Sequence, residues 1–206
     1  MGPLSATSAT DSAYFESLYA GTDDPWDMKN RWYERRKREL LGAMLPRERY
    51  TRAFEPGCGN GLFTLVLAHR CAQVVASDLS AVAVQSARTR LASHVHVDIQ
   101  QGSLPENLPD GQFDLIVVGE LGYYFDLQDW RNIATALIEK LSGDGVLLAC
   151  HWKAPFDARR SSTKDVHDVF HQSPALHAQC RHDESDFIAE IWTRSAASIA
   201  TQEKLR

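Results

Sequence analysis

An acidic residue followed by three glycines at alternate positions is the part of this sequence best suited to chemistry. Residues 54–61 read Phe-Glu-Pro-Gly-Cys-Gly-Asn-Gly, so Glu55 precedes Gly57, Gly59 and Gly61. Glycine has no side chain, so it is suited to positions where the backbone turns sharply or where a ligand contacts the backbone. The segment therefore predicts a turn that binds a ligand.

An expected strand and an expected helix must position this turn. Residues 51–55 form a short, largely apolar run, and residues 62–69 follow the glycines with a helical pattern. Open α/β sheets bind nucleotide-like ligands where a strand ends and a helix begins. A ligand of that kind is expected here.

The rest of the chain repeats this strand-and-helix alternation. Expected strands lie at 51–55, 74–78, 95–100, 113–118 and 145–151, with helices at 62–69, 81–93 and 127–141 between them. Such alternation predicts a doubly wound, parallel α/β sheet. A helix at 164–172 and strands at 176–182 and 187–194 then predict a C-terminal antiparallel hairpin. Ser80 is the expected N-cap of the helix at 81–93.

The length of 206 residues suits one large domain. We expect this domain at 13–195, with an N-terminal helical cap at 13–46 built from helices at 14–20 and 32–45. Residues 1–12 are small and polar and predict a disordered lead-in, and residues 196–206 are expected to form a tail.

The composition limits the kinds of partner that this chain is expected to bind. The net charge is −5, so no overall field draws the chain to nucleic acid or to an anionic membrane. No stretch approaches the roughly 20 apolar residues that cross a bilayer. The four cysteines, Cys58, Cys71, Cys150 and Cys180, are far apart in sequence, which favours free thiols in a reducing cytoplasm.

Two cofactors compete for the glycine turn. The NAD fingerprint needs a third small residue, but this sequence has Leu62 at that position. The negative charge of Glu55 suits a zwitterionic or cationic ligand such as S-adenosylmethionine better than a pyrophosphate. Tyr33 and Lys37 match the Tyr-x-x-x-Lys pair of short-chain dehydrogenases, but they precede the glycines where those enzymes place the pair after them. The pattern favours S-adenosylmethionine, and an NAD enzyme stays a weaker alternative.

Residues after the next two strands complete a nucleoside site. Asp78 ends the second strand, where a carboxylate can accept hydrogen bonds from both ribose hydroxyls of either cofactor, although it could instead cap the following helix. Ser103 follows the third strand, where an adenine edge is usually met, and Leu104 is an expected apolar wall.

The sequence resembles the class I S-adenosylmethionine-dependent methyltransferases and, among them, the nodulation protein S group. The matching residues run from about Tyr14 to Arg194: Asp24-Pro25-Trp26, Tyr33-Glu34 with Lys37, Glu55-x-Gly57-Cys58-Gly59-x-Gly61-x-Phe63-Thr64, Asp78-Leu79-Ser80, Gly119-Glu120 with Tyr123-Tyr124, His151-Trp152, and His182-Asp183-Glu184 with Trp192. Pro56 and Gly122 differ from the apolar residues usual there, and Gly122 lies near the expected substrate pocket.

This resemblance implies a Rossmann-like methyltransferase fold with a seven-stranded, mostly parallel sheet and N-terminal helices over the cofactor. It also implies N-methylation, since nodulation protein S methylates the amine of a deacetylated chitooligosaccharide. The expected cofactor site combines Trp26, Tyr33, Lys37, Glu55, Gly57, Cys58, Gly59, Gly61, Phe63, Asp78, Leu79, Ser103, Leu104, Gly119 and Glu120.

Catalytic candidates lie at the carboxyl ends of the fourth and fifth strands. An amine must be neutral to attack a methyl group, which calls for a proton acceptor or a desolvated pocket. Glu120 and His151 could accept a proton, although His151 could equally be a hydrogen-bonded core residue. Tyr123 and Tyr124 are expected to line the acceptor pocket, with one of them packing in the core.

His167 and His171 stand four residues apart on the late helix, at the spacing of a metal pair. No third ligand is identifiable by spacing, and methyl transfer from a sulfonium needs no metal. We therefore expect a solvated or capping pair and no metal.

The sequence thus predicts a cytoplasmic methyltransferase of a small molecule, most simply an amine, of which an amino sugar is one candidate. Two alternatives stay open: an O-methyltransferase with His151 as base, and a cofactor-binding regulatory module without turnover. Monomer and homodimer are both compatible with the sequence.

Overall fold

The computed structural model describes residues 9–205. The elements, in chain order, are α1 (Ala9–Leu18), α2 (Trp32–Met44), β1 (Tyr50–Pro56), α3 (Leu62–Ala68), β2 (Cys71–Asp78), α4 (Ala81–Arg90), β3 (Val97–Gln101), β4 (Phe113–Gly119), the 3-10 helix η1 (Gly122–Tyr124), α5 (Leu127–Lys140), β5 (Leu141–Trp152), α6 (Thr163–His171), β6 (His177–Asp183), β7 (Phe187–Thr193) and α7 (Ile199–Gln202).

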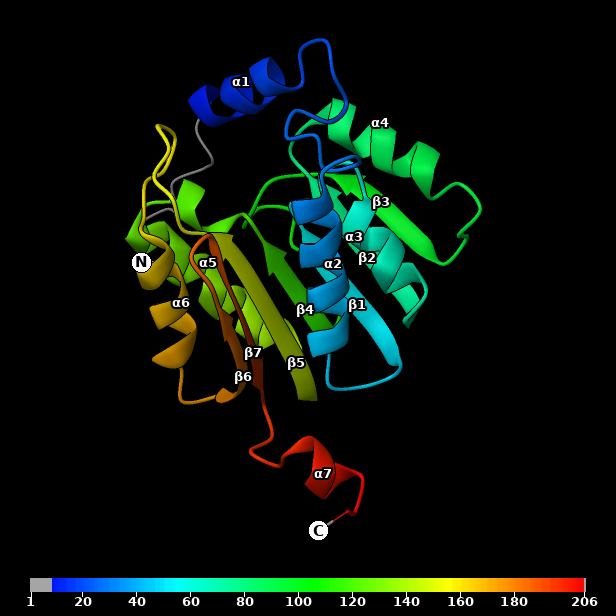
Figure 1. The fold of residues 1–206 in the computed structure, drawn as a ribbon, viewed down its shortest axis with the longest axis vertical. Helices are drawn as coiled ribbons and strands as arrows, with labels where there is room; N and C mark the ends of the chain where they lie inside the picture. Colours follow the sequence, from blue (N-terminus) through cyan, green and yellow to red (C-terminus); the bar gives the residue numbers. More distant parts are fainter. Residues whose placement is uncertain (1–8, 206) are drawn as a thin grey trace.

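The strands form one seven-stranded sheet in the order β3-β2-β1-β4-β5-β7-β6 (Figure 1). β3, β2, β1, β4 and β5 are mutually parallel, whereas β7 runs antiparallel to both β5 and β6. The predicted doubly wound sheet with a C-terminal antiparallel hairpin is confirmed. The strand order reverses between β1 and β4, and ligands bind at such a switch point in open α/β sheets.

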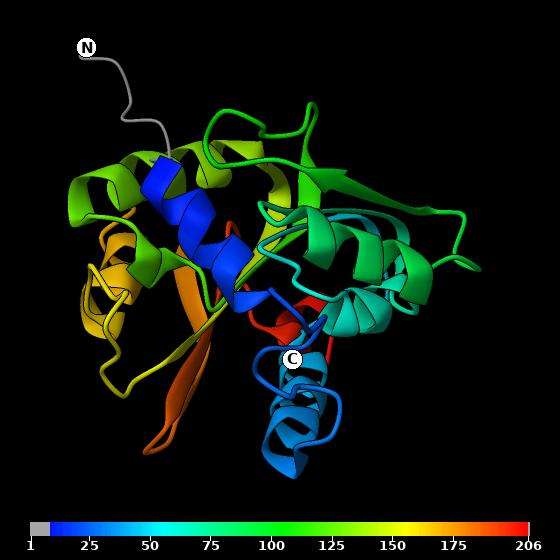
Figure 2. The same cartoon turned by 90° about the horizontal axis from the view of Figure 1, so that it is seen from above.

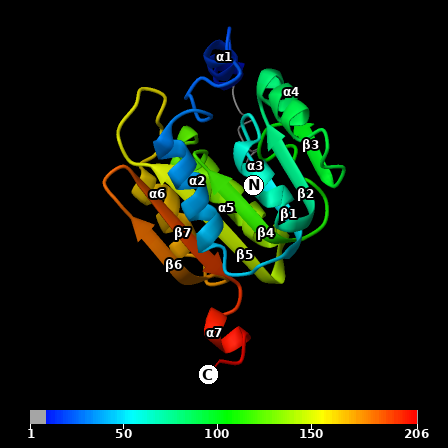
Figure 3. The same ribbon diagram turned by 45° about the vertical axis from the view of Figure 1, so that its right-hand side comes forward.

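Helices cover both faces of the sheet, as Figure 3 shows from the side. α2, α3 and α4 pack on one face, and α5 and α6 pack on the other. Successive strand residues point to opposite faces, so Ala53 of β1 packs with the α2 and α3 side while Phe54 packs with the α5 and α6 side. Burial on both faces explains why the central strands are continuous apolar runs rather than alternating ones.

Local sequence features explain where most helices and strands begin and end. Ser80 caps α4 as expected, because its hydroxyl accepts the Ala83 N–H at 3.3 Å. The third strand was predicted to begin at Val95, but β3 begins at Val97 and Val95 is 97% exposed. An apolar residue on a surface turn gave the misleading strand signal.

α1 lies across the carboxyl ends of the parallel strands, which is clearest from above in Figure 2. The lead-in expected at 1–12 is wrong for residues 9–12, because they form the start of α1, and residues 1–8 lie outside the described residues. α7 projects from the opposite end of the molecule (Figure 1). Across residues 9–205, no helix is both long enough and apolar enough to span a membrane.

Candidate active site

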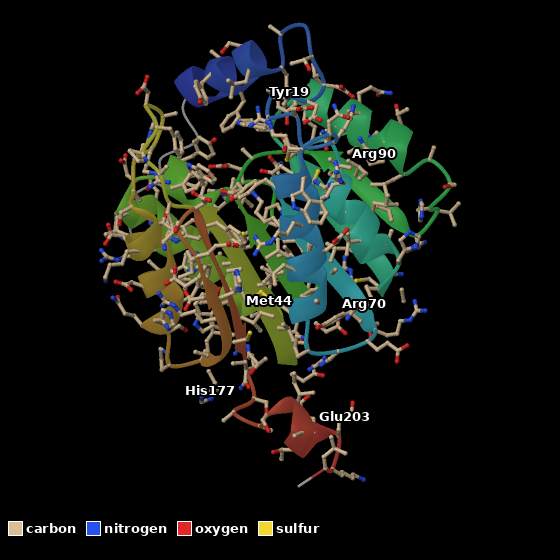
Figure 4. The ribbon with its side chains drawn as sticks, in the orientation of Figure 1. Tyr19, Met44, Arg70, Arg90, His177 and Glu203 are labelled. Carbon is tan, nitrogen blue, oxygen red and sulfur yellow. The ribbon has the colours of Figure 1, made fainter. Side chains whose placement is uncertain are left out.

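A cavity of about 520 Å³ lies at the switch point, between the ends of β1, β2 and β4 and the N-terminal helices. Tyr14 and Phe15 of α1, and Tyr19 just after it, form part of its wall. Tyr19 marks this end of the molecule in Figure 4, and Glu203 marks the far end. The side-chain chemistry predicted from sequence is concentrated around this cavity.

The glycine turn supplies a wall without side chains. Gly57 and Gly59 line the cavity with φ angles of 73° and 54°, a left-handed backbone that favours glycine. A Cβ added at Gly59 would lie 3.5 Å from the Tyr19 hydroxyl, and one at Gly57 would lie 3.4 Å from Leu121. Side chains at either position would project toward residues on the far side of the turn.

Gly61 was predicted to contact the cofactor, but it does not line the cavity. Its φ of 77° starts α3, and an added Cβ would lie only 3.0 Å from Ala87 Cβ and 3.2 Å from Leu91 Cδ1. This third glycine is needed for the close packing of α3 against α4.

Asp78 binds two turns together rather than acting as the side-chain cap of α4. One carboxylate oxygen accepts the Gly59 N–H at 2.8 Å and the other accepts the Ser80 N–H at 2.9 Å. Burial raises its pKa above the usual value, although these hydrogen bonds oppose the shift. Each oxygen retains a further lone pair, so the carboxylate can still accept hydroxyls of a ligand.

Glu55 is a buried acid beside the same cavity. Its relative exposure is 5%, and the Thr64 hydroxyl donates to it at 2.6 Å. Burial raises its pKa to about 8, because the hydrogen bond from Thr64 only partly offsets the loss of water. A cationic ligand group in the cavity would favour its ionised form.

Glu120 is the centre of a charged cluster on the opposite wall. Its Oε1 accepts from Lys37 Nζ at 2.9 Å, and its Oε2 accepts the Tyr123 hydroxyl at 2.5 Å and the Trp152 backbone N–H at 2.8 Å. Its φ of 52° is left-handed, which is costly for a residue with a side chain. The three hydrogen bonds of the carboxylate help to hold Glu120 in this backbone conformation, as expected at a functional position.

Lys37 joins two carboxylates, those of Glu120 and of Glu34 at 3.1 Å. Lys37 was expected in the cofactor site, and it does line the cavity, although it is only 7% exposed because α2 packs it against the sheet. Burial alone would lower its pKa, whereas the nearby negative charges, chiefly Glu120, raise it above the usual value. One ammonium between two carboxylates leaves this cluster with an excess negative charge, which Arg38 near Glu34 partly offsets.

His151 was a candidate base, but the structure places it outside the cavity wall and leaves it no exposed surface. The Gly122 N–H donates to its Nε2 at 3.0 Å, so the ring proton is on Nδ1 and faces His167 Nε2 at 3.0 Å. Burial, followed by the neighbouring His167, lowers its pKa well below the usual value. This geometry supports the core-histidine alternative.

The chain of hydrogen bonds continues from His167 to the carboxylate of Glu190 at 2.7 Å. His171 meets the other Glu190 oxygen at 3.0 Å. The expected solvated or capping pair is wrong for His167, which is 2% exposed, because both histidines turn toward a buried acid on β7. No group of three residues within 9–205 is arranged to hold a metal ion.

Most predicted cofactor residues do come together. Those that line the cavity are Trp26, Tyr33, Lys37, Glu55, Gly57, Cys58, Gly59, Phe63, Asp78, Leu79, Ser103, Leu104, Gly119 and Glu120, together with the catalytic candidate Tyr123.

Sequence reasoning missed several wall residues, notably Tyr14, Phe15, Tyr19 and Phe156, and it missed Glu190 entirely. A glutamate within the apolar run of β7 was an available signal for a buried partner.

Comparisons with known proteins decide the family. A model described as a methyltransferase domain matches residues 53–145. A protein from Pseudomonas syringae, provisionally named a methyltransferase and known by its crystal structure, is 44% identical, with a TM-score of 0.68 over 79% of this chain and 99% of that one. The chain belongs to the class I S-adenosylmethionine-dependent methyltransferases. S-adenosylmethionine, the cofactor expected from the sequence, is the cofactor of this family.

The resemblance to nodulation protein S is also confirmed. The protein of that name from Rhizobium tropici is 32% identical over 133 residues, which are 61% of this chain and 54% of that protein. The chain thus spans just over half the length of this curated relative. The N-methyltransferase NodS of Bradyrhizobium japonicum WM9, crystallised with S-adenosylhomocysteine, aligns with a TM-score of 0.79 over 88% of this chain at 21% identity, a likeness of fold.

The residues of this methyltransferase fit the cofactor of its family. Gly57 and Gly59 leave space for a ligand against the backbone, and Asp78 has acceptor capacity for hydroxyls. Tyr33 lines the cavity, and its buried hydroxyl meets no hydrogen-bond partner within residues 9–205. This hydroxyl has almost no accessible surface, so Tyr33 contributes its ring rather than its oxygen to the cavity wall.

Proposed function

We propose that this chain is an S-adenosylmethionine-dependent methyltransferase that N-methylates a small-molecule amine. The observation that supports the amine is the cluster of Glu34, Lys37, Glu120 and Tyr123, which brings excess negative charge to the cavity wall. A carboxylate-rich wall attracts an ammonium and repels an anionic acceptor. Glu55, Gly57, Gly59, Asp78 and Tyr33 would hold the cofactor.

When bound, S-adenosylmethionine supplies a methyl group already activated by its sulfonium, so catalysis is dominated by positioning. The amine nitrogen must lose a proton before its lone pair can form the new bond. Tyr123 and Glu120 provide the route for this proton. The Tyr123 oxygen can accept a hydrogen bond from the amine while its own proton faces Glu120 Oε2 at 2.5 Å.

O-methylation with His151 as base receives no support from the geometry. Both ring nitrogens of His151 are engaged, one by the Gly122 N–H and one by His167, and the residue lies outside the cavity wall. An alcohol or phenol acceptor would therefore have to use Glu120 rather than His151 as its base. An amine needs only to shed the proton that makes it an ammonium.

The direct test is release of S-adenosylhomocysteine from S-adenosylmethionine in the presence of primary amines, with phenols as the comparison. We expect release with amines and none with phenols. Release with phenols alone would overturn the N-methyl assignment.

Binding measurements separate the remaining alternatives. A thermal shift with S-adenosylhomocysteine and none with NAD is expected, and stabilisation by NAD alone would overturn the cofactor assignment. Tight binding of S-adenosylhomocysteine without turnover of any acceptor would instead favour the regulatory module.

A further inference from the structure

Five aromatic rings form one continuous part of the cavity wall. This aromatic wall consists of Tyr14, Phe15, Tyr123, Tyr124 and Phe156, and all five line the cavity. Their ring centroids are 4.9 Å apart for Phe15 and Tyr124, 5.0 Å for Tyr123 and Phe156, and 5.6 Å for Tyr124 and Phe156. Rings from α1, from η1 and from the segment after β5 therefore form a single apolar surface.

The aromatic wall meets the charged cluster at one residue. Tyr123 belongs to the wall through its ring and to the cluster through its hydroxyl, which donates to Glu120. A second aromatic pair lies near the same Glu120 oxygen, which also accepts the Trp152 backbone N–H, and the Trp152 ring lies 5.7 Å from that of Tyr33. Negative charge is thus placed at the edge of a surface made of aromatic faces.

A cation bound here would meet two favourable interactions. The faces of aromatic rings carry negative charge density that attracts a nearby ammonium, although the Arg159 guanidinium already lies over the rings of Tyr123 and Phe156, 5.0 and 4.9 Å from their centroids. The excess carboxylate of the Glu34, Lys37 and Glu120 cluster adds a direct Coulomb attraction. The amine end of an acceptor is therefore expected at the Tyr123 end of the aromatic wall.

The same surface is a poor match for a sugar ring. A sugar can pack an apolar C–H face on an aromatic ring, but it carries hydroxyls around its rim, and each one buried without a partner costs free energy. The aromatic wall offers only the phenol oxygens of three tyrosines, and the Tyr123 hydroxyl is already engaged with Glu120. An aromatic or other flat apolar body would instead pack against the rings and release water.

We propose that the acceptor at this site is an amine attached to an aromatic or other flat apolar group, rather than an amino sugar. This inference rests on the proposed N-methylation and names its substrate class. Phe156 would be the residue that selects for it, because Phe156 packs against both Tyr123 and Tyr124 and contributes no polar atom.

The test compares benzylamine, propylamine and glucosamine on the wild-type chain saturated with S-adenosylhomocysteine, with binding measured by calorimetry. We expect benzylamine to bind at least tenfold more tightly than either of the others. Phe156→Leu keeps an apolar side chain but removes the ring, and it should weaken benzylamine about fivefold while changing propylamine little. Trp32→Ala removes an aromatic ring that is 63% exposed and outside the cavity wall, so it is the matched control.

Release of S-adenosylhomocysteine with the same three amines then separates this inference from the proposed function. Tighter binding or faster turnover of glucosamine would overturn the inference and leave N-methylation standing. An unchanged benzylamine affinity in Phe156→Leu would also overturn it. Preferential binding of benzylamine without turnover of any amine would support the inference about the ligand and overturn the proposed catalysis.

Discussion

Two polar networks lie at the same end of this sheet, and they differ in what they leave available. The charged cluster of Glu34, Lys37, Glu120 and Tyr123 faces a cavity, and the Glu120 side chain keeps 33% of its surface exposed. The histidine chain of His151, His167 and Glu190 is at most 2% exposed.

The two networks also differ in how their protons are arranged. In the histidine chain the Gly122 N–H donates to His151, His151 donates to His167, and His167 donates to Glu190. Each of these donors therefore has an acceptor within the chain. The charged cluster has more carboxylate than ammonium and therefore retains affinity for a further cation. We infer that the cluster serves the reaction and the histidine chain serves the fold.

The largest effect is expected from Glu120→Gln. This substitution keeps the shape of the side chain but removes the charge that pairs with Lys37 and receives the Tyr123 proton. We expect kcat/KM for an amine acceptor to fall about 10²- to 10³-fold, as for loss of a proton acceptor. Because Lys37 and Tyr123 are buried, the free energy of unfolding, from urea denaturation, should also fall by about 1–3 kcal/mol.

Glu203→Gln is the control for that measurement, because Glu203 is an exposed acid at the far end of the molecule (Figure 4). It should leave kcat/KM unchanged. A Glu120→Gln enzyme with wild-type turnover would remove the difference between the two networks.

Glu190→Gln should lower the stability and leave most of the activity. Burial would raise the pKa of Glu190, but the hydrogen bonds from His167 and His171 hold it below the usual value, so an ionised acid stabilises the histidine chain. Losing a charged hydrogen bond in the core is expected to reduce the free energy of unfolding by about 2 kcal/mol. Because a depressed pKa stabilises only above the folded-state value, this difference should shrink as the pH falls toward that value.

The activity of folded Glu190→Gln should stay within about threefold of wild type. His171→Ala removes a partner of the same acid whose side chain is 37% exposed, so its cost should be below about 1 kcal/mol. A large loss of turnover in Glu190→Gln without loss of stability would assign the histidine chain to catalysis.

A smaller effect is expected at Glu55, which is buried like the histidine chain but faces the cavity like the charged cluster. With a pKa of about 8, Glu55 holds its proton at neutral pH, and a cationic ligand favours the ionised form. Binding of S-adenosylhomocysteine should therefore release a proton below pH 8. Since the ionised fraction rises from about one tenth to about one half, affinity should increase about fivefold from pH 7 to pH 8.

Calorimetry across this pH range measures the effect, and Glu55→Gln should abolish the pH dependence. An affinity in the wild type that is flat between pH 7 and pH 8 would show that Glu55 does not meet the cationic group of the ligand.

Local features of the sequence were sufficient for most of the fold. Apolar runs broken by helical segments predicted the parallel strands, and Ser80 marked the start of α4. The start of α1 was missed because Ala9 to Asp11 are small and polar. Their helix lies across the strand ends, a tertiary position that local propensity does not encode.

The site could be predicted where its chemical groups are close together in the sequence. Glu55, Gly57 and Gly59 are close in sequence and form one turn, so their types and spacing were enough. The aromatic wall joins Phe15 to Phe156 across most of the chain, and no spacing rule connects them. Burial of Lys37 likewise depended on α2 packing against the sheet, which a helical pattern alone does not specify.

The side chains of the adjacent residues His151 and Trp152 on β5 point to opposite faces of the sheet, that of His151 toward His167 and that of Trp152 toward Tyr33. The pleat of a single strand therefore separates the histidine chain from the cavity. Sliding β5 by one residue against β7, where His151 pairs with Ile188, would exchange the two faces. The register of β5 in the sheet thus determines which of its side chains faces the ligand.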